Sequence, residues 1–287
     1  MSNAVITATF KEHRVLQHLT TPLNQAHLVL LISAGAKKAY VHEEQHLEAT
    51  FDLLNACQPK KVSVVVAGKL QRHSFWNANV YNQWSKYPVE EFRNALKSSA
   101  NILEKEAMSR ELAWLNDNEH IIQSKLKCAK ISFVSWQAIL DSESYQENSS
   151  TINQWFKTDA NYRKIAEASV EDYLSHHQKV LKNEEHREIA REMCTQYLLE
   201  ECPLVLPSTL SSDYTIYHSE PNALMQETYH RLFPMALLPW FSVHYQFKPD
   251  GAIVNNEQLI GVSARFHSKR QEKRDFNEDR YRLVGAA

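Results

Sequence analysis

A glutamate interrupts the apolar side of a helix that the sequence predicts over residues 185–202. The polar stripe of this helix holds Glu188, Glu192, Gln196 and Glu200, and the apolar stripe holds Ile189, Ala190, Met193, Cys194, Tyr197 and Leu198. Continuing the apolar row by one turn reaches Glu201. Because burying an unpaired charge is costly, we expect Glu201 to be protonated, paired with a cation, or facing a pocket whose ligand supplies the cation.

Tyr197 lies one turn before Glu201 and points the same way. The two side chains could bind an ammonium group of a ligand, the tyrosine through its hydroxyl or ring and the glutamate through its charge. The alternative is that the helix frays toward Pro203, which would expose Glu201. Taken without further context, these residues favour the frayed helix end over a pocket.

Ser33 is a candidate nucleophile because it ends an apolar run over residues 27–33. Open α/β sheets bind ligands beyond the carboxyl ends of their strands. The small residues that follow at 34–36 (Ala-Gly-Ala) leave the hydroxyl accessible. Serine also ends strands simply by local hydrogen bonding, so the position alone is weak support for catalysis.

The composition excludes several kinds of site. Only 5 of the 287 residues are glycine, and neither a dinucleotide-binding G-x-G-x-x-G nor a phosphate-binding G-x-x-x-x-G-K-[ST] can be written. The 4 cysteines and 14 histidines show no zinc-ligand spacing, so we expect no metal site and no bound cofactor. With 32 basic and 34 acidic residues, any contact with RNA must be a local patch.

The chain shows no targeting or membrane signal. The first nine residues lack a basic region followed by an apolar stretch, and no run approaches the roughly 18 apolar residues of a membrane span. We therefore expect a cytoplasmic protein with free thiols and no membrane partner.

The elements that must position these residues alternate between strand and helix. Predicted strands cover residues 27–33, 62–67, 129–136 and 214–218. Predicted helices cover 42–56, 89–122 and 222–233, two or more helices fill 151–202 with a break near 182–183, and a hairpin turns at 249–251. This order predicts an α/β protein with a mostly parallel, doubly wound sheet in one domain.

Four segments resemble the tRNA-dependent cyclodipeptide synthases, in the same order and with similar gaps. Residues 29–33 (VLLIS) and 62–68 (VSVVVAG) are similar to the nucleophile strand and the next strand of that family. Residues 197–203 (YLLEECP) are similar to its Y-x-x-x-E-x-P signature, and residues 214–218 (YTIYH) to its later tyrosine-histidine segment. The resemblance implies a Rossmann-like sheet similar to the class I aminoacyl-tRNA synthetase catalytic domain. It divides the chain into an N-terminal extension (1–26), the catalytic domain (27–255) and a basic C-terminal tail (256–287).

The resemblance also implies a reaction, a ping-pong aminoacyl transfer that uses two aminoacyl-tRNAs. Ser33 takes the aminoacyl group of the first as an ester, while Tyr197 and Glu201 hold its α-amino group. A second aminoacyl-tRNA supplies the attacking amine, and Tyr217 orients groups or relays a proton as the dipeptidyl-enzyme cyclises to a diketopiperazine. The substrates arrive activated, so no nucleotide is implied, and we expect the enzyme to be a monomer.

The substrate-binding positions that the resemblance implies are Val29, Leu31, Val65, Leu204, Val205 and His218. All but the histidine are apolar, which predicts a hydrophobic first aminoacyl side chain, although apolar residues at such positions are commonly simple core. One subgroup of the family shares His218 but has asparagine and glycine where this chain has Ala36 and Leu31. The assignment to a subgroup therefore stays open.

Contacts with tRNA are expected along the predicted helix at 89–122, because the family has a basic helix in this region. Lys97, Lys105 and Arg110 are the candidates, but nearby glutamates nearly balance their charge. Other candidates for phosphate contact are Lys60, Lys61, Lys69, Arg72 and the tail at 265–274. Solvated surface charge is the simpler explanation for any one of these clusters.

Two other functions fit parts of the sequence. Ser33, Ala34 and Gly35 form half of a nucleophile elbow, which is typical of a serine hydrolase or another acyltransferase, but no histidine base with an acidic partner can be identified. An inactive relative that only binds tRNA is slightly favoured by the weakly basic helix and by Ala36.

Overall fold

The computed structural model of the chain describes residues 5–10, 18–32, 43–74, 88–127, 130–175, 183–217 and 220–248. Within these ranges, six strands form one sheet in the order β1-β6-β5-β2-β3-β4. The strands are β1 (Val5–Phe10), β2 (His27–Ile32), β3 (Lys61–Val66), β4 (Ile131–Ser135), β5 (Tyr214–Tyr217) and β6 (Trp240–Lys248). All neighbours pair in parallel except β1 and β6. The mostly parallel α/β sheet predicted from the sequence is confirmed.

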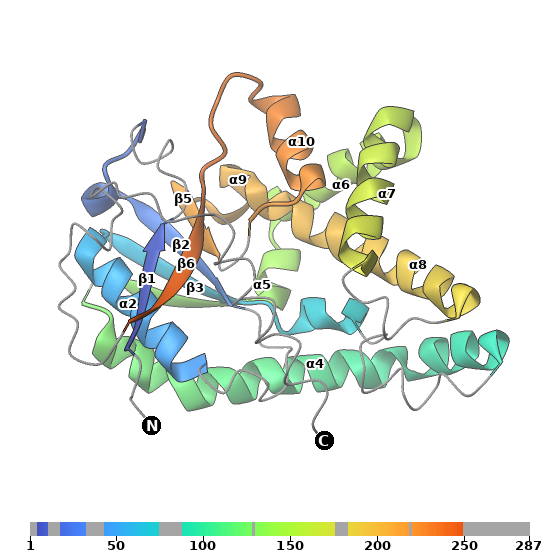
Figure 1. The fold of residues 1–287 in the computed structure, drawn as a ribbon, viewed down its shortest axis with the longest axis horizontal. Coiled ribbons are helices and arrows are strands. Elements are labelled where there is room, and N and C mark those ends of the chain that lie inside the picture. The colour runs from blue at the N-terminus through green and yellow to red at the C-terminus, as the bar shows by residue number, and fades with distance from the viewer. Residues whose placement is uncertain are drawn as a thin grey trace.

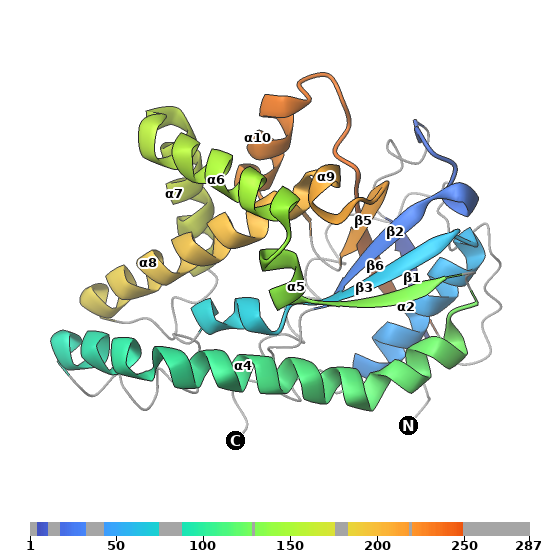
Figure 2. The same cartoon turned by 180° about the vertical axis from the view of Figure 1, so that it is seen from behind.

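Helices cover both faces of the sheet (Figure 1). They are α2 (Glu43–Cys57), α4 (Val89–Lys125), α5 (Trp136–Leu140), α6 (Glu143–Thr158), α7 (Ala160–Ser175), α8 (Glu184–Glu201), α9 (Pro207–Leu210) and α10 (Ala223–Leu232). Short 3₁₀ helices are η1 (Leu23–Gln25), η2 (Lys69–Ser74) and η3 (Cys202–Val205). The 37-residue α4 runs along one side of the molecule and contacts α8, η2 and α2 in turn (Figure 2).

Side chains of each strand alternate between two apolar cores, because successive residues point to opposite faces of the sheet. In β2, Val29 and Leu31 face one core, whereas Leu28 and Leu30 face the other. The first core is closed by α5, α6, α7, α8 and α10, and the second by α2 and the C-terminal half of α4. Burial on both faces explains why β2 and β3 are nearly continuous apolar runs.

The N-terminal segment contributes a strand to this sheet. The sequence predicts an extension over residues 1–26, but β1 lies within that range and pairs antiparallel with β6, with Val5 opposite Lys248 and Phe10 opposite Val243. The sheet therefore begins before the predicted boundary at residue 27. This strand is hard to detect from the sequence because its partner is distant, as the hydrogen bond between Thr9 and His244 across 235 positions shows.

The long helical region predicted over 151–202 consists of three helices, α6, α7 and α8. Helix α6 begins earlier than predicted, at a serine cap in which Ser142 accepts a hydrogen bond from the backbone N–H of Tyr145. Asn183 caps α8 in the same way, accepting from the backbone N–H of Glu185. The predicted hairpin at 249–251 and the tail at 256–287 lie outside the described residues.

Across the parts of the chain that the structure describes, every helix is too short or too polar to cross a membrane.

Candidate active site

The predicted site lies at the carboxyl ends of the parallel strands. Ser33 directly follows β2, which ends at Ile32, and His218 directly follows β5. Both residues lie outside the described residues, as do the side chains of Lys97 and Arg110. Lys105 is described and lies exposed on α4. The parts of the site that can be placed are therefore on α8, β5, β2, β3 and η3.

Glu201 is buried, with 7% of its surface exposed. Helix α8 extends through this residue and continues directly into η3, because Cys202 keeps helical backbone angles and donates its N–H to the carbonyl of Leu198. The frayed end considered from the sequence is therefore wrong. Burial raises the pKa of Glu201 to about 7, while a hydrogen bond with Tyr197 works in the opposite direction. A buried carboxyl group that titrates near neutral pH suits a site that exchanges protons with a ligand.

Tyr197 lies between two other predicted site residues, Glu201 and Tyr217, and interacts with both. Burial raises the pKa of the Tyr197 hydroxyl, and the nearby Glu201 and Tyr217 raise it further. The ring of Tyr197 stacks on Tyr173 of α7, with centroids 6.4 Å apart and planes at 14°. The ring of Tyr217 meets Trp240 of β6 edge-on at 5.8 Å. The structure thus brings together three of the four residues predicted to be catalytic, and their roles remain predictions.

Five apolar residues predicted to bind substrate lie in the same core as the two tyrosines. They are Val29, Leu31, Val65, Leu204 and Val205, none of which is more than 4% exposed. The first three come from adjacent strands, and the last two come from η3, directly after Glu201. A side chain that entered between these segments would meet only apolar atoms at these positions.

Glu200 is not a surface residue, although its sequence position places it on the polar stripe of α8. Its side chain is only 12% exposed. Arg72 donates to both carboxylate oxygens, with Nη1 2.8 Å from Oε1, and the indole Nε1 of Trp136 donates to Oε1 at 2.7 Å. His73 Nε2 lies 3.0 Å from Oε2. Burial tends to raise the pKa of Glu200, but the hydrogen bonds and charges of His73 and Arg72 outweigh it and lower the value to about 2.

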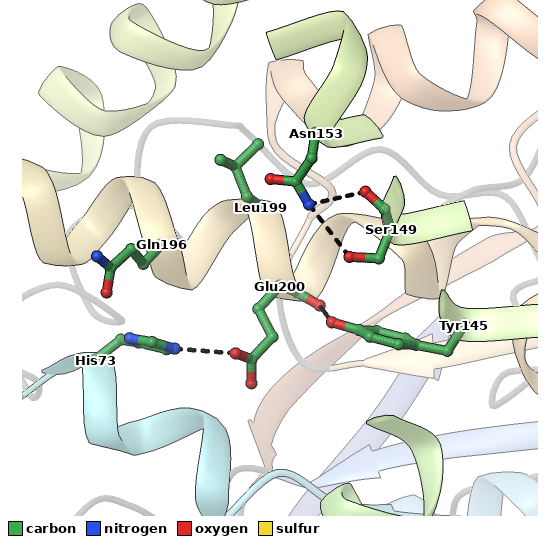
Figure 3. Close-up of a pocket in the computed structure, with 7 residues that line it drawn as sticks. All are labelled: His73, Tyr145, Ser149, Asn153, Gln196, Leu199 and Glu200. Carbon is green, nitrogen blue, oxygen red and sulfur yellow. Dashed lines mark hydrogen bonds and ion pairs between the residues drawn. The ribbon is translucent and has the colours of Figure 1, made fainter. Parts of the chain in front are cut away.

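A cavity of about 260 Å³ opens beside Glu200 (Figure 3). Its lining comes from η2, α6 and α8, namely His73, then Tyr145, Ser149 and Asn153, then Gln196, Leu199 and Glu200. The hydroxyl of Tyr145 donates to the backbone carbonyl of Glu200 at 2.9 Å. The Asn153 amide donates to the backbone carbonyl of Ser149 at 2.8 Å. Sequence reasoning missed this cavity, because its walls come from three distant segments.

Helix α4 is tied to the ends of β3 and β4 by a buried glutamate. Glu111 accepts hydrogen bonds from the backbone N–H groups of Lys69, at 3.1 Å, and Trp136, at 3.0 Å. Gly68 lies so close to this helix that a Cβ there would be 2.3 Å from the Cβ of Glu111. A glycine is therefore required at position 68 by the close approach of α4.

Two of the suggested phosphate-binding residues are engaged within the protein. Lys69 is 9% exposed, forms an ion pair with Glu104 at 2.6 Å and donates to Gln137. Arg72 is paired with Glu200. Neither side chain is available for a tRNA phosphate in this arrangement. The described residues also contain no cluster of three or more histidine, cysteine, aspartate or glutamate side chains suited to a metal ion.

Comparison with known proteins identifies the fold through solved structures. No protein-family model matches the chain, and no curated protein matches it. A cyclodipeptide synthase from Fluoribacter dumoffii is 21% identical over 85% of this chain and 100% of its own, with a TM-score of 0.65. A cyclodipeptide synthase from Candidatus Glomeribacter gigasporarum, bound to Phe-tRNAPhe, is 14% identical over 86% of this chain and 97% of its own, with a TM-score of 0.58.

A third similar structure links this fold to tRNA synthetases. It is a Mycobacterium tuberculosis protein, described as demonstrating that cyclodipeptide synthetases are related to type I tRNA synthetases. It is 13% identical over 87% of this chain and 96% of its own, with a TM-score of 0.52. The chain thus has a mostly parallel α/β fold, as these structures do. The fold is that of the cyclodipeptide synthases, the group that the third structure relates to type I tRNA synthetases.

Proposed function

We propose that this chain is a tRNA-dependent cyclodipeptide synthase, an aminoacyltransferase that joins the aminoacyl groups of two aminoacyl-tRNAs. The observation that carries the proposal is the buried Glu201, which is hydrogen-bonded to Tyr197, with Tyr217 near that tyrosine. A buried carboxylate beside tyrosine side chains is suited to an α-ammonium group. The fold shared with cyclodipeptide synthases, one of them bound to Phe-tRNA, supports the same function.

The first half of the reaction is acyl transfer to Ser33. Its hydroxyl oxygen attacks the ester carbonyl of an aminoacyl-tRNA, and the 3′-terminal hydroxyl of the tRNA leaves with a proton. Tyr197 and Glu201 hold the α-amino group during this step. The product is an aminoacyl ester on Ser33.

The second half builds the peptide bonds. The amine of the Ser33-bound aminoacyl group attacks the ester carbonyl of a second aminoacyl-tRNA, which leaves a dipeptidyl ester on Ser33. The amine that the second aminoacyl-tRNA supplied, now on the newly added residue, then attacks the Ser33 ester carbonyl, closes the ring and restores the serine hydroxyl. Tyr217 orients the groups or relays the proton in this last step.

Glu201 also acts as a proton acceptor in this scheme. An α-ammonium group must lose a proton before its nitrogen can attack. A carboxylate whose pKa lies at about 7 is matched to take that proton near neutral pH. A surface glutamate, with a pKa near 4.3, would be a weaker base for this purpose.

The first aminoacyl side chain is expected to be hydrophobic. Val29, Val65 and Leu204 come from three segments that meet beside the tyrosines, and all three are apolar and buried. A charged side chain among them would lose its hydration with no partner in these residues.

The proposal is tested by incubating the purified protein with total charged tRNA and analysing the products by mass spectrometry. We expect cyclic dipeptides that contain at least one hydrophobic residue. Release of free amino acids alone would indicate a hydrolase, and tRNA binding with no product would indicate an inactive relative. Either result would contradict the proposed function.

A further inference from the structure

Helix α8 ends in a turn that is held from several sides through one residue. The side chains of Arg72, His73 and Trp136 all contact the carboxylate of Glu200. Two of these residues belong to η2, which follows β3, and the third begins α5, which follows β4. Glu200 therefore links the last turn of α8 to the carboxyl ends of β3 and β4.

The backbone of the same residue is also held. The last four carbonyl groups of a helix lack partners within the helix. One of them, the carbonyl of Glu200, accepts a hydrogen bond from the Tyr145 hydroxyl of α6 at 2.9 Å. Figure 3 shows this tyrosine and His73 approaching Glu200 from opposite sides. The side chain of Glu200 is thus bonded to η2 and α5, and its backbone carbonyl is bonded to α6.

The turn that Glu200 holds also carries Tyr197 and Glu201, the two residues proposed to hold the α-ammonium group. Tyr197 lies three residues before it and Glu201 directly after it. The segment η2 also reaches Tyr197 itself, because Gln71 makes a side-chain hydrogen bond with its hydroxyl. A small rotation of this turn would move Tyr197 and Glu201 together.

Space for such a rotation exists beside the turn. The cavity of about 260 Å³ lies between α6, α8 and η2, with Glu200 in its wall. The bonds from Arg72 and His73 keep the carboxylate on the η2 side of this space. Without them, water in the cavity can hydrate Glu200, and of the side chains that bond to Glu200 only Trp136 and Tyr145 still hold this turn.

We propose that Glu200 is a positioning residue for the aminoacyl site, which acts with Arg72 and His73 to hold Tyr197 and Glu201 in their orientation for acylation of Ser33. The inference rests on the proposed function, because its effect is measured as aminoacyl transfer. Removing the charge of Glu200 weakens the bonds from Arg72 and His73 but leaves the chemical groups of Tyr197 and Glu201 unchanged.

The test compares Glu200→Gln with a matched control on the same helix. Glu192 lies on the same polar stripe, two turns earlier, and forms an ion pair with Arg93 at 3.1 Å, but its side chain is 51% exposed. Single-turnover acylation of Ser33 by aminoacyl-tRNA is followed for the wild type, Glu200→Gln and Glu192→Gln. Circular dichroism confirms that each variant is folded at the assay temperature.

We expect Glu200→Gln to lower the maximal acylation rate constant at least tenfold and to change the half-saturating aminoacyl-tRNA concentration less than twofold. Glu192→Gln should match the wild type in both. A wild-type acylation rate in Glu200→Gln, even with lowered thermal stability, would overturn the proposal and leave Glu200 a purely structural residue. An equal loss in Glu192→Gln would overturn it as well.

If Glu200→Gln does not fold, two milder variants test the positioning role of Glu200. Arg72→Lys keeps the charge but loses the two-pronged bond, and His73→Gln removes one ring contact and keeps the Arg72 pair. Each should lower the maximal rate severalfold, and wild-type rates in both would overturn the proposal. Absence of any aminoacyl-enzyme in the wild type would instead overturn the proposed function itself.

Discussion

Replacing Glu201 with glutamine should stabilise the protein at pH 8 and change its stability little at pH 5. Burial raises the pKa of Glu201 from 4.5 to about 7, so between these values the folded state holds a proton that the unfolded state has released. The contribution of this group is therefore fully present below pH 4.5 and is lost as the pH rises to 7. At about 1.4 kcal/mol per pH unit, the loss amounts to about 3 kcal/mol. Glutamine stays neutral with a similar shape, so it does not incur this loss.

The measurement is urea denaturation of the wild type and Glu201→Gln at several pH values from 5 to 8. The difference in unfolding free energy between the two proteins should grow by about 3 kcal/mol across this range in favour of the variant. Glu104→Gln is the control, because the hydrogen bond and charge of Lys69 lower the pKa of Glu104 and this carboxylate stays ionised throughout. Its difference from the wild type should not change with pH. A pH-independent difference for Glu201→Gln would refute the inference that burial raises the pKa of this carboxyl group.

Three further substitutions test the packing around the site. Gly68→Ala would place a Cβ 2.3 Å from the Cβ of Glu111. We expect the free energy of unfolding to fall by about 1–3 kcal/mol, which lowers the melting temperature. An unchanged melting temperature would contradict the close approach of α4. Glu111→Gln turns an amide NH₂ toward the backbone N–H of Lys69 or Trp136. We expect the free energy of unfolding, measured with denaturant, to fall by about 1–3 kcal/mol. An unchanged value would show that these N–H groups find other acceptors. Tyr197→Phe removes the hydrogen bond that lowers the pKa of Glu201, so the pH midpoint of the Glu201-dependent stability change should move upward, and a downward shift would count against that bond.

The central strands were predictable from the sequence because they are buried on both faces. Successive residues of β2 and β3 face two different cores. Because the residues that face each core must be apolar, the sequence of each strand is a nearly unbroken apolar run. Strand β1 leaves no such signal. It has a single described neighbour, β6, at the far end of the chain, so nothing local distinguishes it from an extension.

The shared row of Tyr197 and Glu201 on α8 was also predictable from the pattern of apolar residues. Helical periodicity places Tyr197 and Glu201 on one row, and the burial of Glu201 follows from the apolar residues that precede it on that row. Periodicity identifies a face, but it does not identify what packs against that face. Glu200 lies on the polar stripe and is nevertheless covered by Arg72, which is 128 positions away in the sequence. Only the sheet topology brings η2 to α8.

The central claim is that Ser33 carries the aminoacyl group between two tRNAs, and the mass of the intact protein tests it most directly. The purified protein is mixed with a single charged tRNA, quenched with acid and weighed by mass spectrometry beside Ser33→Ala. The account predicts that the wild type gains the mass of one aminoacyl group and that Ser33→Ala gains none. An adduct of the same mass on Ser33→Ala, or a wild type that stays unmodified while cyclic dipeptide accumulates, would contradict it.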